Sequence, residues 1–289
     1  MSAIQTAEAN ITNQSGKAMS SIKGFFKSNT LVSKVVFIIL VVIGFVLLLH
    51  LGTLLLGYIF EPSSSPYLVS GVKDARKLLI IPQDPKNPNS VPVMRSRNQD
   101  KGIEFTWSVW LNVDDLVYKN GQKKHVFHKG SGNFKEQTAF PNNAPGLYIH
   151  PTRNSLIVIM NTYKNIVEEV EITDLPMHKW VNVAIRVEGR IMDVFINGDI
   201  ALRHTFDGVP KQNYGDVYVN LNGGFSGQLS DLWYHNYALS GVKIMDIVRA
   251  GPNLRSQTSK SINAPPYLSL QWFFEQGASP TNNMWPTDA

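Results

Sequence analysis

An uninterrupted apolar run near the N-terminus constrains this chain more than any other feature. From Val35 to Phe60 the sequence contains no Asp, Glu, Lys or Arg, with Lys34 on one side and Glu61 on the other. A helix rises about 1.5 Å per residue, so this run is longer than the roughly 30 Å of a bilayer's hydrocarbon core. A buried core helix rarely stays apolar on every face for so long, and a cleaved signal peptide has a shorter apolar region. The run therefore predicts a transmembrane helix in contact with the lipid bilayer.

The charges that flank this run predict its orientation. Four lysines precede it, namely Lys17, Lys23, Lys27 and Lys34, and the first basic residue after it is Lys73. Because basic residues are retained on the cytoplasmic side, we expect a cytoplasmic N-terminus and a C-terminal domain on the opposite side of a membrane that the chain crosses once.

Charge and cysteine content exclude several classes of function. The formal net charge is +5, but the first 60 residues carry +3 of it, so the remaining 229 residues are nearly neutral. This domain also lacks an Arg/Lys run with interleaved aromatic residues, so we expect no nucleic-acid partner. The absence of cysteine excludes disulfides, Cys-ligated metals and a Cys nucleophile, and it favours a bacterial, viral or reducing setting.

The chain divides into five parts along its length. They are a polar basic arm over residues 1–34, the transmembrane helix over 35–60, a Pro-rich stalk and entry strand over 61–102, a globular domain over 103–251 and a tail over 252–289. Residues 77–81 predict the entry strand. The tail contains an apolar segment, 267–274, that predicts a strand returning to the domain beside residues 78–81.

The apolar residues of the globular domain alternate with a period of two. From Glu104 to Val113, every second side chain is apolar, which predicts a strand with one buried side. The pair Asn197-Gly198 predicts a tight hairpin turn, because both residues readily adopt positive φ angles. Further strands are expected over residues 125–129, 146–150, 155–163, 166–172, 180–187, 201–206, 216–221 and 225–235. Ser240 to Ala250 predicts a helix that Ser240 caps and that ends before Gly251-Pro252. The whole predicts an all-β antiparallel sandwich.

Four segments resemble laminin-G-like domains of the concanavalin A-like lectin/glucanase superfamily. They are FTWSVWL from Phe105, HVFHKG from His125, HKWVNVAIRVEG from His178 with DVFING from Asp193, and FSGQLSDLWY from Phe225. Their order and spacing match the family over residues 100–251. The resemblance implies a jelly-roll sandwich of two antiparallel sheets, which says less about function because sites are grafted onto folds.

The sequence argues against catalysis. Glycosidases of this superfamily share a strand with the pattern Glu-x-Asp-x-x-Glu, and retaining chemistry requires two carboxyl groups about 5–5.5 Å apart. That strand is missing here. Glu168, Glu169 and Glu171 come closest, but neighbouring positions on a strand point to opposite faces. We therefore expect a protein that is not an enzyme and has no catalytic residues or cofactor.

Two sets of residues are candidates for binding. Many laminin-G-like domains hold calcium at the rim of the sandwich, and Asp114 and Asp115 end a strand at such a rim, although solvated turn acids are the simpler interpretation. Trp233, Tyr234 and His235 are candidates for stacking on a sugar, although aromatic residues on strands are more often buried. Further aromatic candidates are Tyr148, Tyr163, Tyr214 and Tyr237.

A basic segment and the overall architecture leave two functions open. Lys123 to His125 and His128-Lys129 predict an exposed charged hairpin, or else a basic patch for an anionic glycan or headgroup. The first function is an anchored interaction or structural protein with a protein partner in an envelope or capsid assembly, such as a minor capsid component beside the internal membrane of a virion. The alternative is a lectin-like receptor that binds carbohydrate, with or without calcium.

Overall fold

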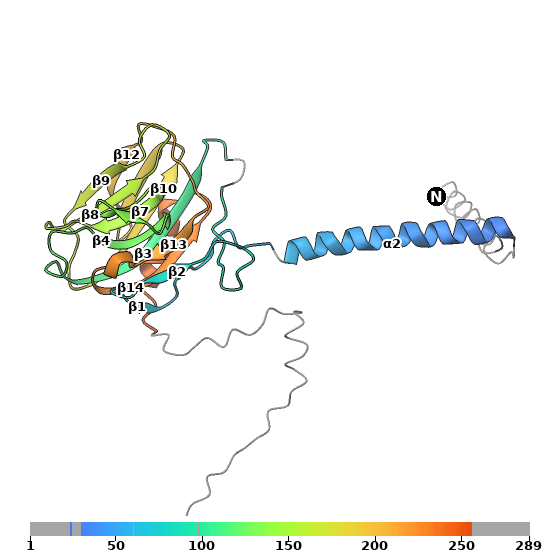
Figure 1. The fold of residues 1–289 in the computed structure, drawn as a ribbon, viewed down its shortest axis with the longest axis horizontal. Coiled ribbons are helices and arrows are strands. Elements are labelled where there is room, and N and C mark those ends of the chain that lie inside the picture. The colour runs from blue at the N-terminus through green and yellow to red at the C-terminus, as the bar shows by residue number, and fades with distance from the viewer. Residues whose placement is uncertain (1–23, 25–29, 60, 97–98, 256–289) are drawn as a thin grey trace, which may run out of the picture. The chain divides into compact units, whose positions relative to one another are not determined.

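The structure, a computed structural model, describes residue 24 and residues 30–59, 61–96 and 99–255. It consists of two units, Met1–Pro62 and Ser63–Ala289 (Figure 1), and each is described by itself. The predicted returning strand at 267–274 lies outside the described residues.

The first unit contains one long apolar helix, α2, over Leu31–Ile59. Its 29 residues span about 43 Å at 1.5 Å per residue, more than the thickness of a bilayer's hydrocarbon core. Apolar side chains are exposed around its whole circumference, and Ser33 is its one buried residue among those described. The predicted helix is therefore present, begins four residues earlier than expected and is long and apolar enough to cross a membrane.

The second unit is built almost entirely of short strands. They are β1 (Val72–Asp74), β2 (Leu79–Ile81), β3 (Glu104–Asp115), β4 (Lys124–Gly130), β5 (Phe134–Lys135), β6 (Thr138–Ala139), β7 (Asn143–Ile149), β8 (Ser155–Met160), β9 (Glu168–Thr173), β10 (Trp180–Glu188), β11 (Ile191–Ile196), β12 (Asp199–Thr205), β13 (Asp216–Val219) and β14 (Ser226–His235). A 3₁₀ turn at Leu221–Gly223 and a helix, α3, over Gly241–Ala250 complete the described elements.

The strands form two six-stranded sheets and one small hairpin. The first sheet has the order β1-β14-β3-β10-β11-β12, the second has the order β2-β13-β4-β7-β8-β9, and β5 pairs with β6. Each strand pair is antiparallel, and Figure 1 shows the two layers facing each other. The predicted all-β antiparallel sandwich is confirmed.

The hydrophobic core lies between the two sheets. The alternating residues of β3, from Phe105 to Val113, contribute one wall of it, and Val181 to Val187 of β10 continue that wall. Leu147, Leu156 and Val158 of the second sheet face them. Burial of this apolar surface is the main term that holds the sheets together.

Both outer faces are also partly covered, which the sequence pattern did not predict. Helix α3 packs on the first sheet over Ala184 and Phe195. Trp110, on the face of β3 expected to be open, is only 6% exposed. The prediction of one buried side for this strand was therefore wrong.

Predictions made from short local sequence patterns were more accurate than the prediction of burial. Asn197 and Gly198 adopt φ angles of 52° and 92° in the turn between β11 and β12, as expected for their pair. The Ser240 hydroxyl accepts a hydrogen bond from the Lys243 backbone nitrogen at the start of α3. The predicted hairpin and the predicted capped helix are both confirmed.

Two edge strands come from the segment expected to be a stalk. Strand β1 pairs with β14 in the first sheet, and β2, which falls within the predicted entry strand, pairs with β13 in the second. Residues 82–96, called the strap below, follow β2 and lead to β3. The strap is what positions the site described next.

Candidate functional site

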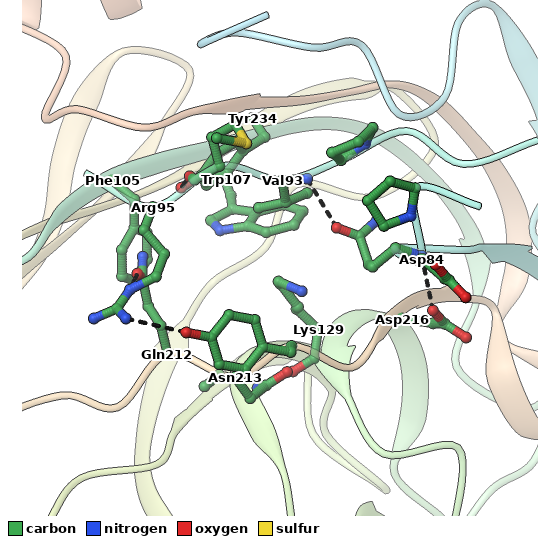
Figure 2. A pocket seen from close by; sticks show the side chains of 16 residues that line it. Asp84, Val93, Arg95, Phe105, Trp107, Lys129, Gln212, Asn213, Asp216 and Tyr234 are labelled. Atoms are coloured by element: carbon green, nitrogen blue, oxygen red, sulfur yellow. Dashed lines mark hydrogen bonds between the residues drawn. The ribbon is translucent and has the colours of Figure 1, made fainter. Parts of the chain in front are cut away.

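A cavity of about 560 Å³ lies at one end of the sandwich, under the strap. It is called the end cavity below. Its lining residues are Gln83, Asp84, Pro85, Pro92, Val93, Met94, Arg95, Phe105, Trp107, Lys129, Ala144, Gln212, Asn213, Tyr214, Asp216 and Tyr234 (Figure 2). They come from both sheets, the strap and the loop that precedes β13.

Aromatic rings of the first sheet form one wall of the end cavity. Phe105 and Trp107 lie two residues apart on β3, so both side chains point inward, and Tyr234 of the neighbouring β14 lies beside them. The Trp107 and Tyr234 ring centroids are 4.9 Å apart with their planes tilted by 57°. Each of these rings is almost fully buried, so the wall is fixed by the core behind it.

Hydrogen bonds hold the strap over this wall. The Gln83 side-chain amide donates to the Val91 carbonyl oxygen at 2.9 Å, and its oxygen accepts from the Val93 backbone nitrogen at 2.8 Å. The Tyr234 hydroxyl donates to the Met94 carbonyl oxygen at 2.6 Å. Burial raises the pKa of Tyr234, so this hydroxyl keeps its proton.

Lys129 of β4 reaches into the end cavity from the opposite sheet. Figure 2 shows its amine below the Trp107 ring. The residue is 6% exposed, and its Nζ donates to the Gly215 carbonyl oxygen at 2.6 Å. Burial lowers the pKa of Lys129 to about 8, against the opposing effect of the nearby Asp216 charge. The cavity therefore contains a buried amine that is still mostly protonated at pH 7.

Charged groups lie at opposite sides of the cavity. On one side, Arg95 donates to Gln212 Oε1 at 3.2 Å and to the Tyr214 hydroxyl at 3.4 Å. On the other side lie Asp84 and Asp216, and Asp216 accepts from the Gln83 backbone nitrogen at 2.9 Å (Figure 2). This arrangement can orient a polar end of a bound molecule against an apolar wall.

The candidate aromatic residues of β14 point to two different faces. Tyr234 lines the end cavity, whereas Trp233 and His235 lie on the outer face of the first sheet. Trp233 stacks on Tyr67 with a centroid distance of 4.3 Å, and its indole nitrogen donates to the Ser65 carbonyl oxygen at 2.9 Å. His235 Nδ1 lies 2.9 Å from the Ser65 hydroxyl oxygen. Trp233 and His235 thus bind the segment that follows the apolar helix in sequence.

The structure brings no third His, Cys, Asp or Glu of the described residues to the calcium candidates Asp114 and Asp115. Asp115 accepts hydrogen bonds from the Ser226 hydroxyl at 2.5 Å and the Tyr118 backbone nitrogen at 2.8 Å, and these bonds lower the pKa of its carboxyl group. Asp114, its neighbour on the strand, is exposed. Within residues 30–59, 61–96 and 99–255, no three His, Cys, Asp or Glu side chains gather closely enough to hold a metal.

The three glutamates of β9 are engaged in separate interactions. Glu168 accepts from His204 Nε2 and from the Asp207 backbone nitrogen. Glu169 pairs with Lys123 at 2.5 Å, and Glu171 pairs with Arg153 at 2.6 Å. Each carboxylate therefore has its own structural partner.

The basic segment of β4, which reaches the end cavity at Lys129, was interpreted incorrectly from the sequence. Lys124, His125, His128 and Lys129 are all buried on β4, so they form neither an exposed hairpin nor a surface patch. Lys129 was missed as a cavity residue for this reason. The one signal available was its place in an alternating strand segment, since Phe127 and Lys129 share a face.

Comparison with known proteins agrees with this architecture. A laminin G-type family model, described as concanavalin A-like lectin/glucanases superfamily, matches residues 89–245. None of the curated proteins compared with the sequence matches it.

Similar solved structures include two from botulinum neurotoxin D. One is its receptor binding domain, with 10% identity, a TM-score of 0.44, and coverage of 65% of this chain and 52% of that one. The other is its ligand binding domain in complex with N-acetylneuraminic acid, with 11% identity, a TM-score of 0.43, and coverage of 63% and 46%. The present chain thus spans about half the length of these structures.

Proposed function

The chain belongs to the concanavalin A-like lectin/glucanases superfamily, and from that premise we propose that it is a membrane-anchored, non-enzymatic interaction protein. In this proposal α2 crosses a membrane once, and the sandwich docks to a protein partner in an envelope or in a virion with an internal membrane. There it serves as a minor structural component that links membrane and shell.

The observation that carries the proposal is the apolar surface of α2. Apolar side chains are exposed on every side of this 29-residue helix, and water would solvate such a surface poorly. The hydrocarbon core of a lipid bilayer solvates this apolar surface, so no further protein is needed to cover it. With a cytoplasmic N-terminus, as the flanking lysines favour, the sandwich lies on the opposite side of the membrane.

The engagement of the three β9 glutamates supports a binding role rather than hydrolysis. A glycosidase keeps an acid and a nucleophile or base free to face the scissile bond. The β9 glutamates are instead bound to His204, Lys123 and Arg153.

Carbohydrate binding is a second candidate, because two tyrosine rings are open to solvent. Tyr163 is 74% exposed and Tyr214 is 82% exposed, and such rings can stack on the apolar face of a sugar. A receptor of this kind would depend on these rings, and on calcium if the Asp114–Asp115 rim held one.

Affinity capture from the source membrane separates the two candidates. The bait is the tagged full-length chain in mild detergent, with and without EDTA and with and without free sugars. A docking protein recovers one protein partner in constant proportion under all conditions, and a variant with Tyr163→Ala and Tyr214→Ala recovers it equally. Recovery of glycoconjugates that EDTA or free sugar releases, and that the tyrosine variant loses, would replace the proposal with the lectin.

A further inference from the structure

The burial of Lys129 in the end cavity requires an explanation beyond packing. Lysine is almost never fully buried unless it is paired, because removing a charge from water is costly. An ammonium has three donors, and among the described residues the Gly215 carbonyl is the one hydrogen-bond acceptor of this amine. Two donors are thus left for whatever occupies the cavity, because Asp216 acts on the amine through its charge but neither it nor another described carboxylate forms a direct ion pair with it.

We propose that the end cavity binds an aromatic monocarboxylate, with the carboxylate paired to the Lys129 ammonium and the flat ring against Trp107. This site is independent of the membrane anchor and of the protein partner proposed above. The bound anion would complete the hydrogen bonding of the amine.

The shape of the cavity fits a flat apolar body. The rings of Trp107 and Phe105 line one side of it (Figure 2), and the largely exposed Tyr214 lines its mouth. The volume of about 560 Å³ is within the range of small-molecule sites, which are typically about 300–1,000 Å³. Aromatic rings gain most from such walls through offset or tilted stacking.

The charges around the cavity favour a single negative charge over a phosphate. Lys129 supplies one buried positive charge, and Arg95 adds a second at the mouth through a side chain already bonded to Gln212 and Tyr214. Asp84 and Asp216 line the opposite side and would repel a dianion. A carboxylate carries one charge, so it can pair with Lys129 at a smaller cost in repulsion from these acids than a dianion.

A simpler role for Lys129 would be to fasten the loop before β13. Its amine bonds Gly215, and Asn213 Nδ2 donates to the Lys129 carbonyl oxygen at 3.0 Å. A role confined to this loop predicts no preference between charged and uncharged ligands. The experiment therefore compares two ligands of the same shape.

Equilibrium dialysis of the full-length chain in lipid nanodiscs measures binding directly, with empty nanodiscs as the blank. The probes are 1-naphthoate and its uncharged analogue 1-naphthalenemethanol. We expect saturable binding of naphthoate at one site per chain. Lys129→Met should weaken naphthoate binding by at least about tenfold, since a charge-assisted hydrogen bond is lost, and should leave the alcohol unaffected.

Two further variants make the result specific to this cavity. Lys124→Met removes another buried lysine of β4, whose amine bonds the His150 and Pro151 carbonyls, and should leave naphthoate binding unchanged. Val93→Trp enlarges a strap residue that lines the cavity and should abolish binding of both probes. The proposal is overturned if naphthoate binds no more than to empty discs. Equal naphthoate affinity of the Lys129→Met and parent chains would overturn it too, as would naphthoate binding that persists in Val93→Trp.

Discussion

His125 Nε2 lies 2.7 Å from His128 Nδ1, in a buried chain of hydrogen bonds that fixes which nitrogen of each ring is protonated. The Leu221 backbone nitrogen donates to His125 Nδ1 at 2.9 Å, so the proton of His125 is on Nε2 and is donated to His128. His128 Nε2 in turn donates to the Ser131 carbonyl oxygen at 2.9 Å. Both rings are neutral in this arrangement, and a further proton on either would break a hydrogen bond.

This chain predicts that the sandwich loses stability in mild acid. Burial lowers the pKa of His128 from 6.5 to about 4, and burial together with His128 lowers that of His125 well below 6.5. Below pH 6.5 both histidines bind protons in the unfolded chain but stay neutral in the folded chain. The free energy of unfolding therefore falls as the pH drops. For His128 alone the loss at pH 4 is about 3 kcal/mol.

Urea unfolding of the full-length chain in detergent, followed by tryptophan fluorescence, measures this loss between pH 7 and pH 4. His128→Gln should flatten the decline, whereas His178→Gln, at an exposed position, should not. A decline of equal slope in His128→Gln and the parent chain would show that acid acts elsewhere.

Lys129 predicts a second pH dependence, at the alkaline side. Its pKa is about 8 in the folded chain and 10.5 for an unperturbed lysine, so between these pH values the folded state releases a proton that the unfolded state retains. The free energy of unfolding should therefore rise by up to about 3 kcal/mol between pH 8 and pH 10.5. The rise should be absent in Lys129→Met and present in Lys243→Met, whose lysine is exposed on α3. If the Lys129→Met chain keeps the rise, the amine is not the group responsible.

Asp231 links the segment where the chain enters the sandwich to the segment where it leaves, so we expect its substitution to lower stability. Its carboxylate accepts from the Gly71 backbone nitrogen at 3.0 Å and from the Asn253 backbone nitrogen at 2.9 Å. Asp231→Asn leaves only one oxygen to accept, and asparagine tolerates the φ of 46° at this position. We expect a loss of about 1.5–3 kcal/mol in the free energy of unfolding.

The matched control is Asp246→Asn on α3, where the carboxylate is half exposed and 3.9 Å from Arg249. A surface pair of this kind contributes at most about 1 kcal/mol. Equal urea midpoints for the two variants would contradict the role given to Asp231.

The sequence predicted those parts of the fold that depend on local chemistry. The Asn197-Gly198 turn and the Ser240 cap need only their own residues, and both were found where expected. Burial of β4 depends on distant segments instead: the β5–β6 region places Phe134 near His125, with centroids 6.4 Å apart, and the core covers the other face. The residue pattern of one strand contains no information about which distant segments bury it.

The end cavity could not be predicted from the sequence for the same reason. Its walls come from positions as far apart as Gln83 and Tyr234, and the strap that closes it is the Pro-rich segment interpreted as a stalk. Proline content correctly indicates irregular backbone there. It does not indicate that this backbone folds over the end of a sandwich.

The measurement that tests the central claim most directly is labelling of single cysteines in membrane vesicles. The chain has no cysteine of its own, so Ser15→Cys in the N-terminal arm and Val117→Cys, at a residue 81% exposed on the sandwich, are clean reporters. In inside-out vesicles, a membrane-impermeant maleimide should label Ser15→Cys at once and Val117→Cys only after detergent is added. Labelling of both positions without detergent, or release of the chain by alkaline carbonate, would contradict a single membrane span with the sandwich on the far side.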